Sequence, residues 1–133
     1  MSRRMHVQTR LGTEFGCALE RMVLRTPGAY ASVVSDEEGD AIDYAHDPDR
    51  IDGLEVQLLG AQLGMPLFKL HSTADAQGFT DPLLMVETRT HNLVASPVRH
   101  AFVVAMLLER RANLGLALEA FSDGRDALSA LLG

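Results

Sequence analysis

Five histidines are the first residues to test for chemistry, because a neutral imidazole is a common metal ligand. Their nearest acidic or paired neighbours give three sets: His46 with Asp47, His71 with Asp75, and His91 with His100. None of these sets has the His-x-x-x-His spacing that places two ligands on one face of a helix. We therefore expect no metal site, and solvated side chains at His46 and His91, which fall in predicted turns.

Cys17 is the single cysteine of the chain. It lies beside Gly16 in a predicted helix, away from the apolar face of that helix. A catalytic thiol needs a neighbouring base and an oxyanion site, and the sequence indicates neither. We interpret Cys17 as inert and partly packed. A lone cysteine also excludes an internal disulfide and suits a reducing compartment.

The sequence contains no glycine-rich phosphate loop of the kind that cradles a nucleotide. Gly12, Gly16, Gly60 and Gly64 all fall in predicted helices. We therefore expect no bound nucleotide and no cofactor.

Four acidic residues crowd one polar connection: Asp36, Glu37, Glu38 and Asp40. Their spacing is not that of a calcium-binding loop. We interpret this connection as a solvated turn.

The composition excludes several classes of function. The 133 residues carry a net charge of -6, whereas a nucleic-acid-binding protein normally presents a basic face. The longest apolar run, residues 101–108, is far shorter than the roughly 20 residues that cross a bilayer. Residues 1–10 are polar and basic with no apolar stretch behind them, so they do not resemble a signal peptide. These features predict a cytoplasmic protein that neither binds nucleic acid nor inserts into membranes.

The first half of the chain alternates between helix and strand patterns. Residues 1–10 are predicted to be a flexible tail, and residues 11–133 a single domain. A helical pattern begins at Leu11 and ends at Thr26-Pro27-Gly28, because proline cannot continue the helix. Two short strands follow, at residues 29–35 and 41–45, joined by the acidic turn around Gly39.

The second half begins with a long helix, predicted over about residues 49–71, with Asp47 as its N-cap. Residues 72–82 read as a loop, followed by strands at 83–88, 93–96 and 101–108. Asn113 can cap a final helix. The element order is α-β-β-α-β-β-β-α, which predicts a five-stranded antiparallel sheet with helices on both faces.

The helix at residues 49–71 carries two opposed apolar stripes. One, the Leu54 stripe, comprises Ile51, Leu54, Leu58, Ala61, Met65 and Phe68. The other, the Leu63 stripe, comprises Val56, Leu59, Leu63, Leu67 and Leu70. The phase runs through Pro66 without a slip, which indicates a kink there and not an end. A helix with two apolar sides needs partners on both, and its own sheet can cover only one.

Two interpretations of this helix stay open: a fully buried central helix, or a helix that pairs with a second chain. In so short a chain, few other elements are available to cover it, which favours pairing. We expect the Leu63 stripe to face the second chain, because it lacks alanine and aromatic members. Gly60 and Gly64 lie four residues apart and would let another backbone approach. Glu55, Gln62 and Lys69 form a polar flank that should stay solvated and contact a further partner.

The order of elements, together with several short motifs, resembles the Roadblock/dynein-light-chain family. The motifs are Thr26-Pro27-Gly28 after the first helix, Val33-Val34 in the next strand, the Gly39 hairpin, and Ala112-Asn113-Leu114-Gly115-Leu116-Ala117-Leu118 before the final helix. The resemblance spans Phe15 to Leu132. It departs from the family at Asp40, where an apolar residue usually follows the hairpin glycine.

The resemblance implies a profilin-like α/β sandwich of the Roadblock type, most similar to the prokaryotic GTPase-regulator branch. It also implies a homodimer in which two sheets join edge to edge and the second helices pair. Family members serve as platforms for small Ras-like GTPases, as GTPase-activating partners in bacterial motility and polarity, or as dynein-associated subunits. The implied partners are thus a second copy, a small Ras-like GTPase, or another Roadblock-type protein.

A GTPase-activating protein can supply an arginine in trans, and Arg99, Arg110 and Arg111 are placed in turns where they could do so. Solvated turn arginines are the more common explanation. Further interpretations are a structural assembly subunit without a GTPase partner, or a small-ligand sensor domain. We expect a non-catalytic domain, because no arrangement of nucleophile, base or metal ligands emerges from the sequence.

Overall fold

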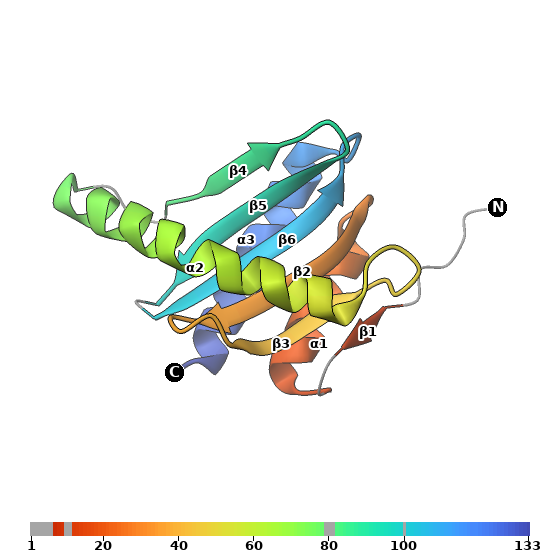
Figure 1. Cartoon of the computed structure of the whole chain (residues 1–133), viewed down its shortest axis with the longest axis horizontal. Coiled ribbons are helices and arrows are strands. Elements are labelled where there is room, and N and C mark those ends of the chain that lie inside the picture. Colours follow the sequence, from red (N-terminus) through yellow and green to blue (C-terminus); the bar gives the residue numbers. More distant parts are fainter. Residues whose placement is uncertain (1–6, 10–11, 79–81, 100) are drawn as a thin grey trace.

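The structure, a computed structural model, describes residues 7–9, 12–78, 82–99 and 101–133. This part of the chain forms one sheet and three helices (Figure 1). In chain order the elements are β1 (Gln8–Thr9), α1 (Glu14–Arg25), β2 (Ala29–Asp36), β3 (Ala41–His46), α2 (Gly53–Ala76), β4 (Leu84–Glu87), β5 (His91–Val98), β6 (Phe102–Glu109) and α3 (Leu114–Leu131).

Every pair of neighbouring strands is antiparallel, in the order β1-β3-β2-β6-β5-β4. The predicted mixed α/β class and antiparallel sheet are confirmed, but the described sheet has six strands instead of five. The additional strand is β1, whose Gln8 and Thr9 pair with His46 and Ala45 of β3. The sequence assigns these residues to a tail, because a two-residue polar strand has no hydrophobic alternation to detect.

The sheet is buried on both faces. Figure 1 shows α2 crossing one face and α1 and α3 covering the other. Side chains of the central strands alternate between two cores, as the two-residue period of a strand requires. The core under α2 contains Ala31, Val33, Leu93, Ala95, Val103, Ala105 and Leu107. The core under α1 and α3 contains Val34, Val94, Val98, Val104, Met106 and Leu108.

The start of α2 differs from the prediction. Its N-cap is Asp52, whose side chain accepts a hydrogen bond from the Glu55 amide at 2.8 Å. The predicted cap, Asp47, instead organises the preceding turn. Its side chain accepts a hydrogen bond from the Asp49 amide, and its backbone carbonyl accepts one from the Arg50 amide. Both aspartates precede the helix within one turn-forming segment, so cap chemistry alone does not choose between them.

The end of α2 also differs from the prediction. The helix continues through Pro66, as its uninterrupted phase indicates, and ends at Ala76 instead of about His71. Residues 72–76, predicted to be a loop, are therefore helical. The predicted start of the first helix at Leu11 lies outside the described residues; α1 begins at Glu14, after the N-cap Thr13.

A buried carboxylate joins α1 to the sheet. Asp43 of β3 is fully buried, and its Oδ2 accepts a hydrogen bond of 2.6 Å from the Thr13 hydroxyl. Its Oδ1 accepts from the Tyr44 amide at 2.8 Å. A Cβ on Gly16 would lie 2.6 Å from Asp43 Oδ2, so the first turn of α1 approaches the carboxylate closely. The positive end of the helix dipole at this turn further stabilises the charge.

We expect Asp43→Ala to lower the free energy of unfolding by about 1–3 kcal/mol, because it leaves the half-buried Thr13 and Tyr44 donors without this acceptor. Chemical denaturation followed by circular dichroism measures the change. The matched control is Asp126→Ala on α3, an exposed position where a change within about 0.5 kcal/mol is expected. Equal stabilities of the two variants would contradict a stabilising role for Asp43.

Candidate functional site

The long helix α2 is the element that positions the candidate site. Its 24 residues span about 36 Å at 1.5 Å per residue. It contacts β2, β3, β6 and β5 of its own sheet, and Figure 1 shows its C-terminal turns projecting beyond the sheet. A helix that passes the edge of its own sheet exposes more than the usual single face.

The Leu63 stripe faces the sheet of its own chain. Val56 and Leu67 are completely buried, and Leu59, Leu63 and Leu70 pack against the same core. The prediction that this stripe covers a second chain is therefore wrong in its choice of side. Helical periodicity gives the angle between the two stripes, but it does not say which one the sheet buries.

Gly60 allows α2 to approach β2 of the same chain. A Cβ on Gly60 would lie 2.3 Å from Ser35 Oγ and 3.2 Å from a methyl group of Val33. A Cβ on Gly64 would meet only Phe68, at 3.8 Å, on the same helix. The close backbone approach predicted from these two glycines thus occurs at Gly60, but the approaching backbone is the chain's own strand.

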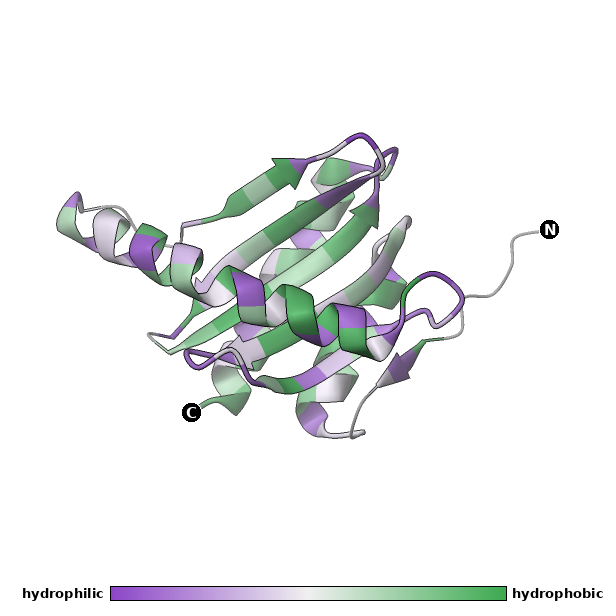
Figure 2. Ribbon diagram, in the orientation of Figure 1, coloured by the Kyte–Doolittle hydropathy of each residue, from purple (hydrophilic) through white to green (hydrophobic). Residues whose placement is uncertain are grey.

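The Leu54 stripe is the apolar side of α2 that lies in solvent. Leu54 is 64% exposed, Leu58 52% and Met65 73%, and Ala61 between them is also exposed. Ile51 and Phe68, at its two ends, are half-buried against the core. Figure 2 shows apolar residues interspersed with polar ones along α2. The prediction of a two-sided helix is thus confirmed in its geometry.

The predicted polar flank divides into two parts. Glu55 and Gln62 are exposed and line a hollow with Tyr30, Arg50 and other residues at one end of the sheet. Lys69 is exposed as well, but it lines a different hollow, with Glu37, Met65 and Phe68. The three residues are solvated, as expected, without forming one site.

An aromatic and charged cluster closes one end of the first hollow. The Arg50 guanidinium lies 4.7 Å from the centroid of the Tyr30 ring and forms an ion pair with Glu109. Burial raises the pKa of the Tyr30 hydroxyl above its usual value, while Arg50 lowers it and Glu109 raises it further. This cluster joins β2, β6 and the turn before α2, so it holds the start of α2 against the sheet.

The two edges of the described sheet differ. At one edge, β1 pairs with Ala45 and His46 of β3. At the other edge lies β4, and among the described residues no strand follows it. Val86 of β4 is 38% exposed. An edge strand presents unpaired backbone groups that can pair with another chain.

The three histidines that the structure describes do not gather into one site. His46 is buried at the end of β3, where its Nδ1 lies 2.8 Å from the Ile51 carbonyl oxygen, so the prediction of a solvated turn side chain is wrong. His91 is half-buried, and its Nδ1 lies beside the Thr90 hydroxyl. The Nε2 atom of His71 lies 3.4 Å from Oδ2 of Asp75. His100 lies outside the described residues. In the described ranges, no group of three His, Cys, Asp or Glu side chains could hold a metal ion.

The remaining candidate residues are on the surface. Cys17 is exposed on α1, not partly packed as predicted. Arg99 donates to the Ser129 carbonyl oxygen at 3.0 and 3.2 Å, which ties the β5–β6 turn to α3. Arg110 donates to the Arg89 carbonyl oxygen at 3.3 Å, and Arg111 is exposed.

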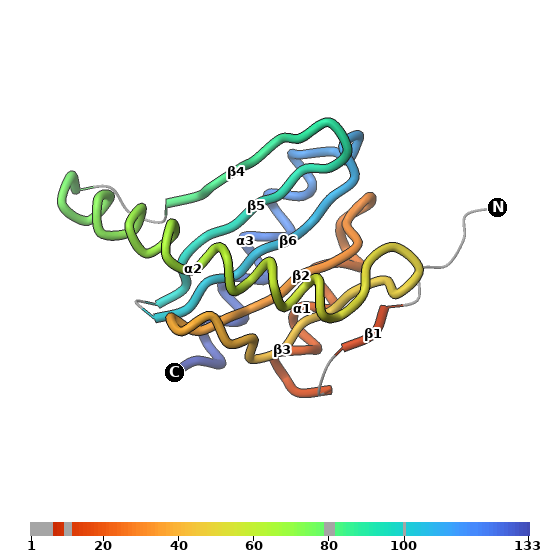
Figure 3. Tube along the Cα trace, in the orientation of Figure 1, coloured from red at the N-terminus to blue at the C-terminus, as the bar shows by residue number. Residues whose placement is uncertain are grey.

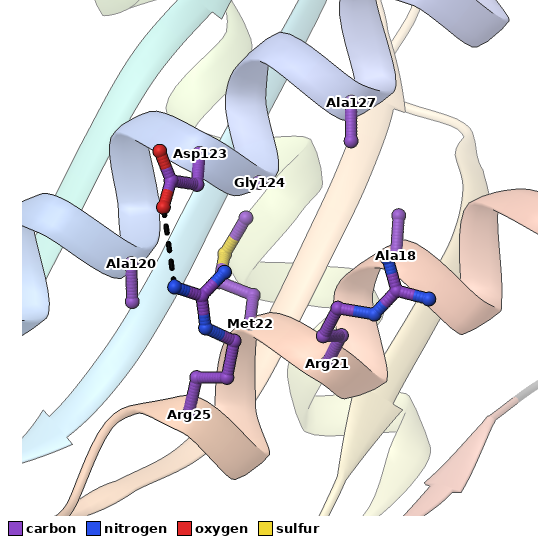
Figure 4. Close-up of a pocket in the computed structure, with 8 residues that line it drawn as sticks. All are labelled: Ala18, Arg21, Met22, Arg25, Ala120, Asp123, Gly124 and Ala127. Carbon is purple, nitrogen blue, oxygen red and sulfur yellow. Dashed lines mark hydrogen bonds and ion pairs between the residues drawn. The ribbon is translucent and has the colours of Figure 1, made fainter.

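A small hollow between α1 and α3 lies on the opposite side of the sheet. Figure 4 shows Arg25 reaching across it to Asp123, at 3.2 Å. Gly124 lets Met22 pack directly against α3, since a Cβ there would lie 2.2 Å from the Met22 methyl group. These contacts join the two helices and leave little room for a ligand. Within the described residues, no helix is both long and apolar enough to span a bilayer.

No family model matches the sequence, and no curated protein matches it. Several solved structures share its fold. MglB of Myxococcus xanthus has 18% identity and a TM-score of 0.75, over 90% of this chain and 87% of that chain. A Roadblock/LC7 domain of Streptomyces avermitilis has 18% identity and a TM-score of 0.72, over 87% of this chain and 95% of that chain. Gliding protein MglB of Thermus thermophilus has 13% identity and a TM-score of 0.75, over 88% and 87%.

At these identities the likeness concerns the fold. The chain therefore has the Roadblock/LC7 fold, which confirms the fold that the short sequence motifs imply. The additional strand β1 lies at the outer edge of this sandwich and leaves the order of the other elements unchanged.

The two glycines of α2 provide a matched test of its packing. Gly60→Ala should be less stable than Gly64→Ala by about 1–3 kcal/mol, because both gain helix propensity but only the first crowds β2. Urea denaturation of both variants and the wild type measures the difference. If both variants gained stability equally, α2 would not approach β2 at Gly60.

Proposed function

We propose that this chain is a non-catalytic, cytoplasmic, dimeric interaction domain that regulates or scaffolds a small Ras-like GTPase. The observation that carries the proposal is the exposed Leu54 stripe on a helix whose other side is already buried. Full burial of a leucine or methionine side chain contributes about 1.5–3 kcal/mol. An exposed row of such residues is typical of a protein interaction site.

The open edge at β4 supports self-association. The resemblance to Roadblock domains implies that two sheets join edge to edge, and β4 is the edge that the described chain leaves unpaired. The β3 edge is occupied at Ala45 and His46 by β1. One MglB structure is described as having a tetrameric arrangement, which supports assembly by domains of this fold. We infer a homodimer formed through β4, with the two α2 helices on the same face of the joined sheet.

The proposed GTPase partner rests on the family resemblance and on the structural likeness to MglB, which one of the solved structures calls a gliding protein. The same likeness supports a role for the domain in a bacterial motility or polarity system. In a dimer, two Leu54 stripes would form one platform for the partner. Another Roadblock-type protein is the alternative partner of this platform.

A structural assembly subunit is the second candidate function. The same Leu54 stripe could be covered by further copies of the chain, in which case no GTPase is needed. The two functions differ in which molecule covers the stripe.

The decisive experiment uses purified small Ras-like GTPases from the same source organism, loaded with fluorescent GTP. We expect one of them to bind the wild type, and Leu58→Glu/Met65→Glu to weaken binding by about a hundredfold because of the desolvated charge. Fluorescence anisotropy measures binding, and single-turnover hydrolysis separates regulation from scaffolding. Leu24→Glu is the control, since Leu24 is 52% exposed on α1. Equal binding by both variants would contradict this surface.

Dimer formation has its own test. Val86→Glu should raise the dimer dissociation constant at least about tenfold, because antiparallel pairing of two β4 strands brings the two copies of this residue close together. Sedimentation velocity over a concentration series measures the constant. Leu116→Glu on α3 is the control, since Leu116 is similarly exposed. A wild type that remains a monomer at micromolar concentration would contradict the dimer.

A further inference from the structure

The β2–β3 hairpin places acidic side chains beside the Leu54 stripe. The turn between β2 and β3 is closed by hydrogen bonds from the Asp36 amide to the Asp40 carbonyl and from the Gly39 amide to the Asp36 carbonyl. Asp36 Oδ1 also accepts from the amides of Glu38 and Asp40, at 2.9 and 3.0 Å. One acidic side chain therefore orders the turn, while Glu37, Glu38 and Asp40 remain exposed.

The hairpin is seated on α2 at the middle of the stripe. Gly39 has a φ of 88°, and a Cβ there would lie 3.3 Å from both the Cα and the Cβ of Ala61. Figure 3 traces the hairpin to a turn beside α2. Because the backbone of the turn is ordered and in contact with the helix, its acidic residues are held next to the exposed apolar residues.

Acidic and apolar residues line the same hollows. On one side of the contact, Asp40 lines a hollow with Leu54 and Leu58. On the other side, Glu37 lines a hollow of about 450 Å³ with Met65 and Phe68. The apolar stripe and the acidic turn are thus two parts of one surface.

Most of the other charges on this surface are also acidic. Asp52 and Glu55, both exposed, lie at the N-terminal end of α2. Of the nearby basic residues, Arg50 is already paired with Glu109. Lys69 is the exposed basic residue that lines the second hollow. The surface is therefore apolar along its centre and mostly acidic along its sides, with Lys69 as an exposed basic exception.

We propose that the Leu54 stripe and the acidic turn together bind an amphipathic helix of a partner protein whose apolar face is bordered by lysine or arginine. This proposal rests on the proposed function and specifies the chemistry of its partner. The apolar side chains supply the buried area, and Glu37 and Asp40 select basic side chains on the partner. A second copy of this chain is a poor occupant, because it would bring its own acidic turn against this one.

Binding of a basic helix and binding of a second copy of this chain should respond to salt in opposite ways. Screening weakens the attraction between acidic and basic side chains, so a basic helix should dissociate as salt rises. Screening also weakens repulsion between like charges, so stacking of two copies through the stripe should be strengthened by salt. The sign of the salt dependence therefore identifies the class of occupant.

The test uses two synthetic helical peptides of roughly five turns with the same leucine face, one bordered by lysine and the other by glutamate. Binding to the full chain is measured by fluorescence anisotropy at about 50 mM and 500 mM salt, where the screening length falls from over 10 Å to below 5 Å. We expect the lysine peptide to bind at least about tenfold more tightly at low salt, and this preference to shrink at high salt.

Three variants locate the effect. Glu37→Gln/Asp40→Asn should weaken binding of the lysine peptide about tenfold. Glu119→Gln/Asp126→Asn, two exposed acidic residues of α3, changes the net charge equally and should leave binding unchanged. Leu58→Ser/Met65→Ser should abolish binding of both peptides. Circular dichroism confirms that each variant is folded.

Different failures have different meanings. If the stripe variant abolishes binding but the hairpin and α3 variants behave alike, the acidic turn has no role and only this inference is overturned. If the stripe variant still binds as well as the wild type, the proposed function of the Leu54 stripe is overturned too. A glutamate peptide that binds equally well, or stripe-dependent self-association that strengthens with salt, would also overturn the basic partner.

Discussion

The architecture depends on a sheet that is apolar on both faces but is covered by two helices on one face and by a single helix on the other. On one face, α1 and α3 lie side by side over Val34, Val94, Val104 and their neighbours. On the other face, α2 alone must cover Val33, Ala105 and Leu107. A single helix is about 10 Å wide, whereas six strands at nearly 5 Å spacing form a much wider surface. This imbalance explains why α2 is long and why exposed apolar side chains gather on its side.

The close contact at Gly60 shows how α2 meets this demand. Without a side chain at Gly60, the helix can lie near Ser35 of β2, which buries Val56 and Leu67 completely. A helix drawn so closely to the sheet directs its opposite side straight into solvent. Exposure of Leu54, Leu58 and Met65 is thus the geometric counterpart of tight packing on the other side.

The sequence predicts the residue pattern within an element better than the packing of one element against another. The angle between the two stripes of α2 follows from helical periodicity, and the phase correctly predicts that the helix passes Pro66. Which stripe meets the sheet depends on the distance between α2 and β2, which no local pattern encodes. Gly60 carried a usable signal, because a glycine within a helix marks a close approach, but the sequence does not name the approaching strand.

Other differences have the same origin. β1 has only two residues and exists because β3 offers an edge, so hydrophobic alternation gives no indication of it. His46 is buried because the turn before α2 brings the Ile51 carbonyl to its ring. Asp43 reads as a polar residue in a strand until the first turn of α1 supplies donors to it. In each case the partner is distant in sequence or in an irregular segment.

The acidic turn illustrates how one local feature can have two roles. Asp36 is needed to order the turn, since it accepts two backbone hydrogen bonds, and a solvated turn is a sufficient explanation of the sequence alone. Contact between Gly39 and Ala61 changes that interpretation, because it places the remaining carboxylates beside an apolar surface that nothing in the described chain covers.

Apolar burial does not discriminate among helices with similar leucine faces. Charges at the border of such a surface do, because they penalise partners of like sign and accelerate encounters with partners of opposite sign. Affinity and selectivity are therefore assigned to different elements: α2 provides the buried area, and the β2–β3 hairpin determines which helix can use it.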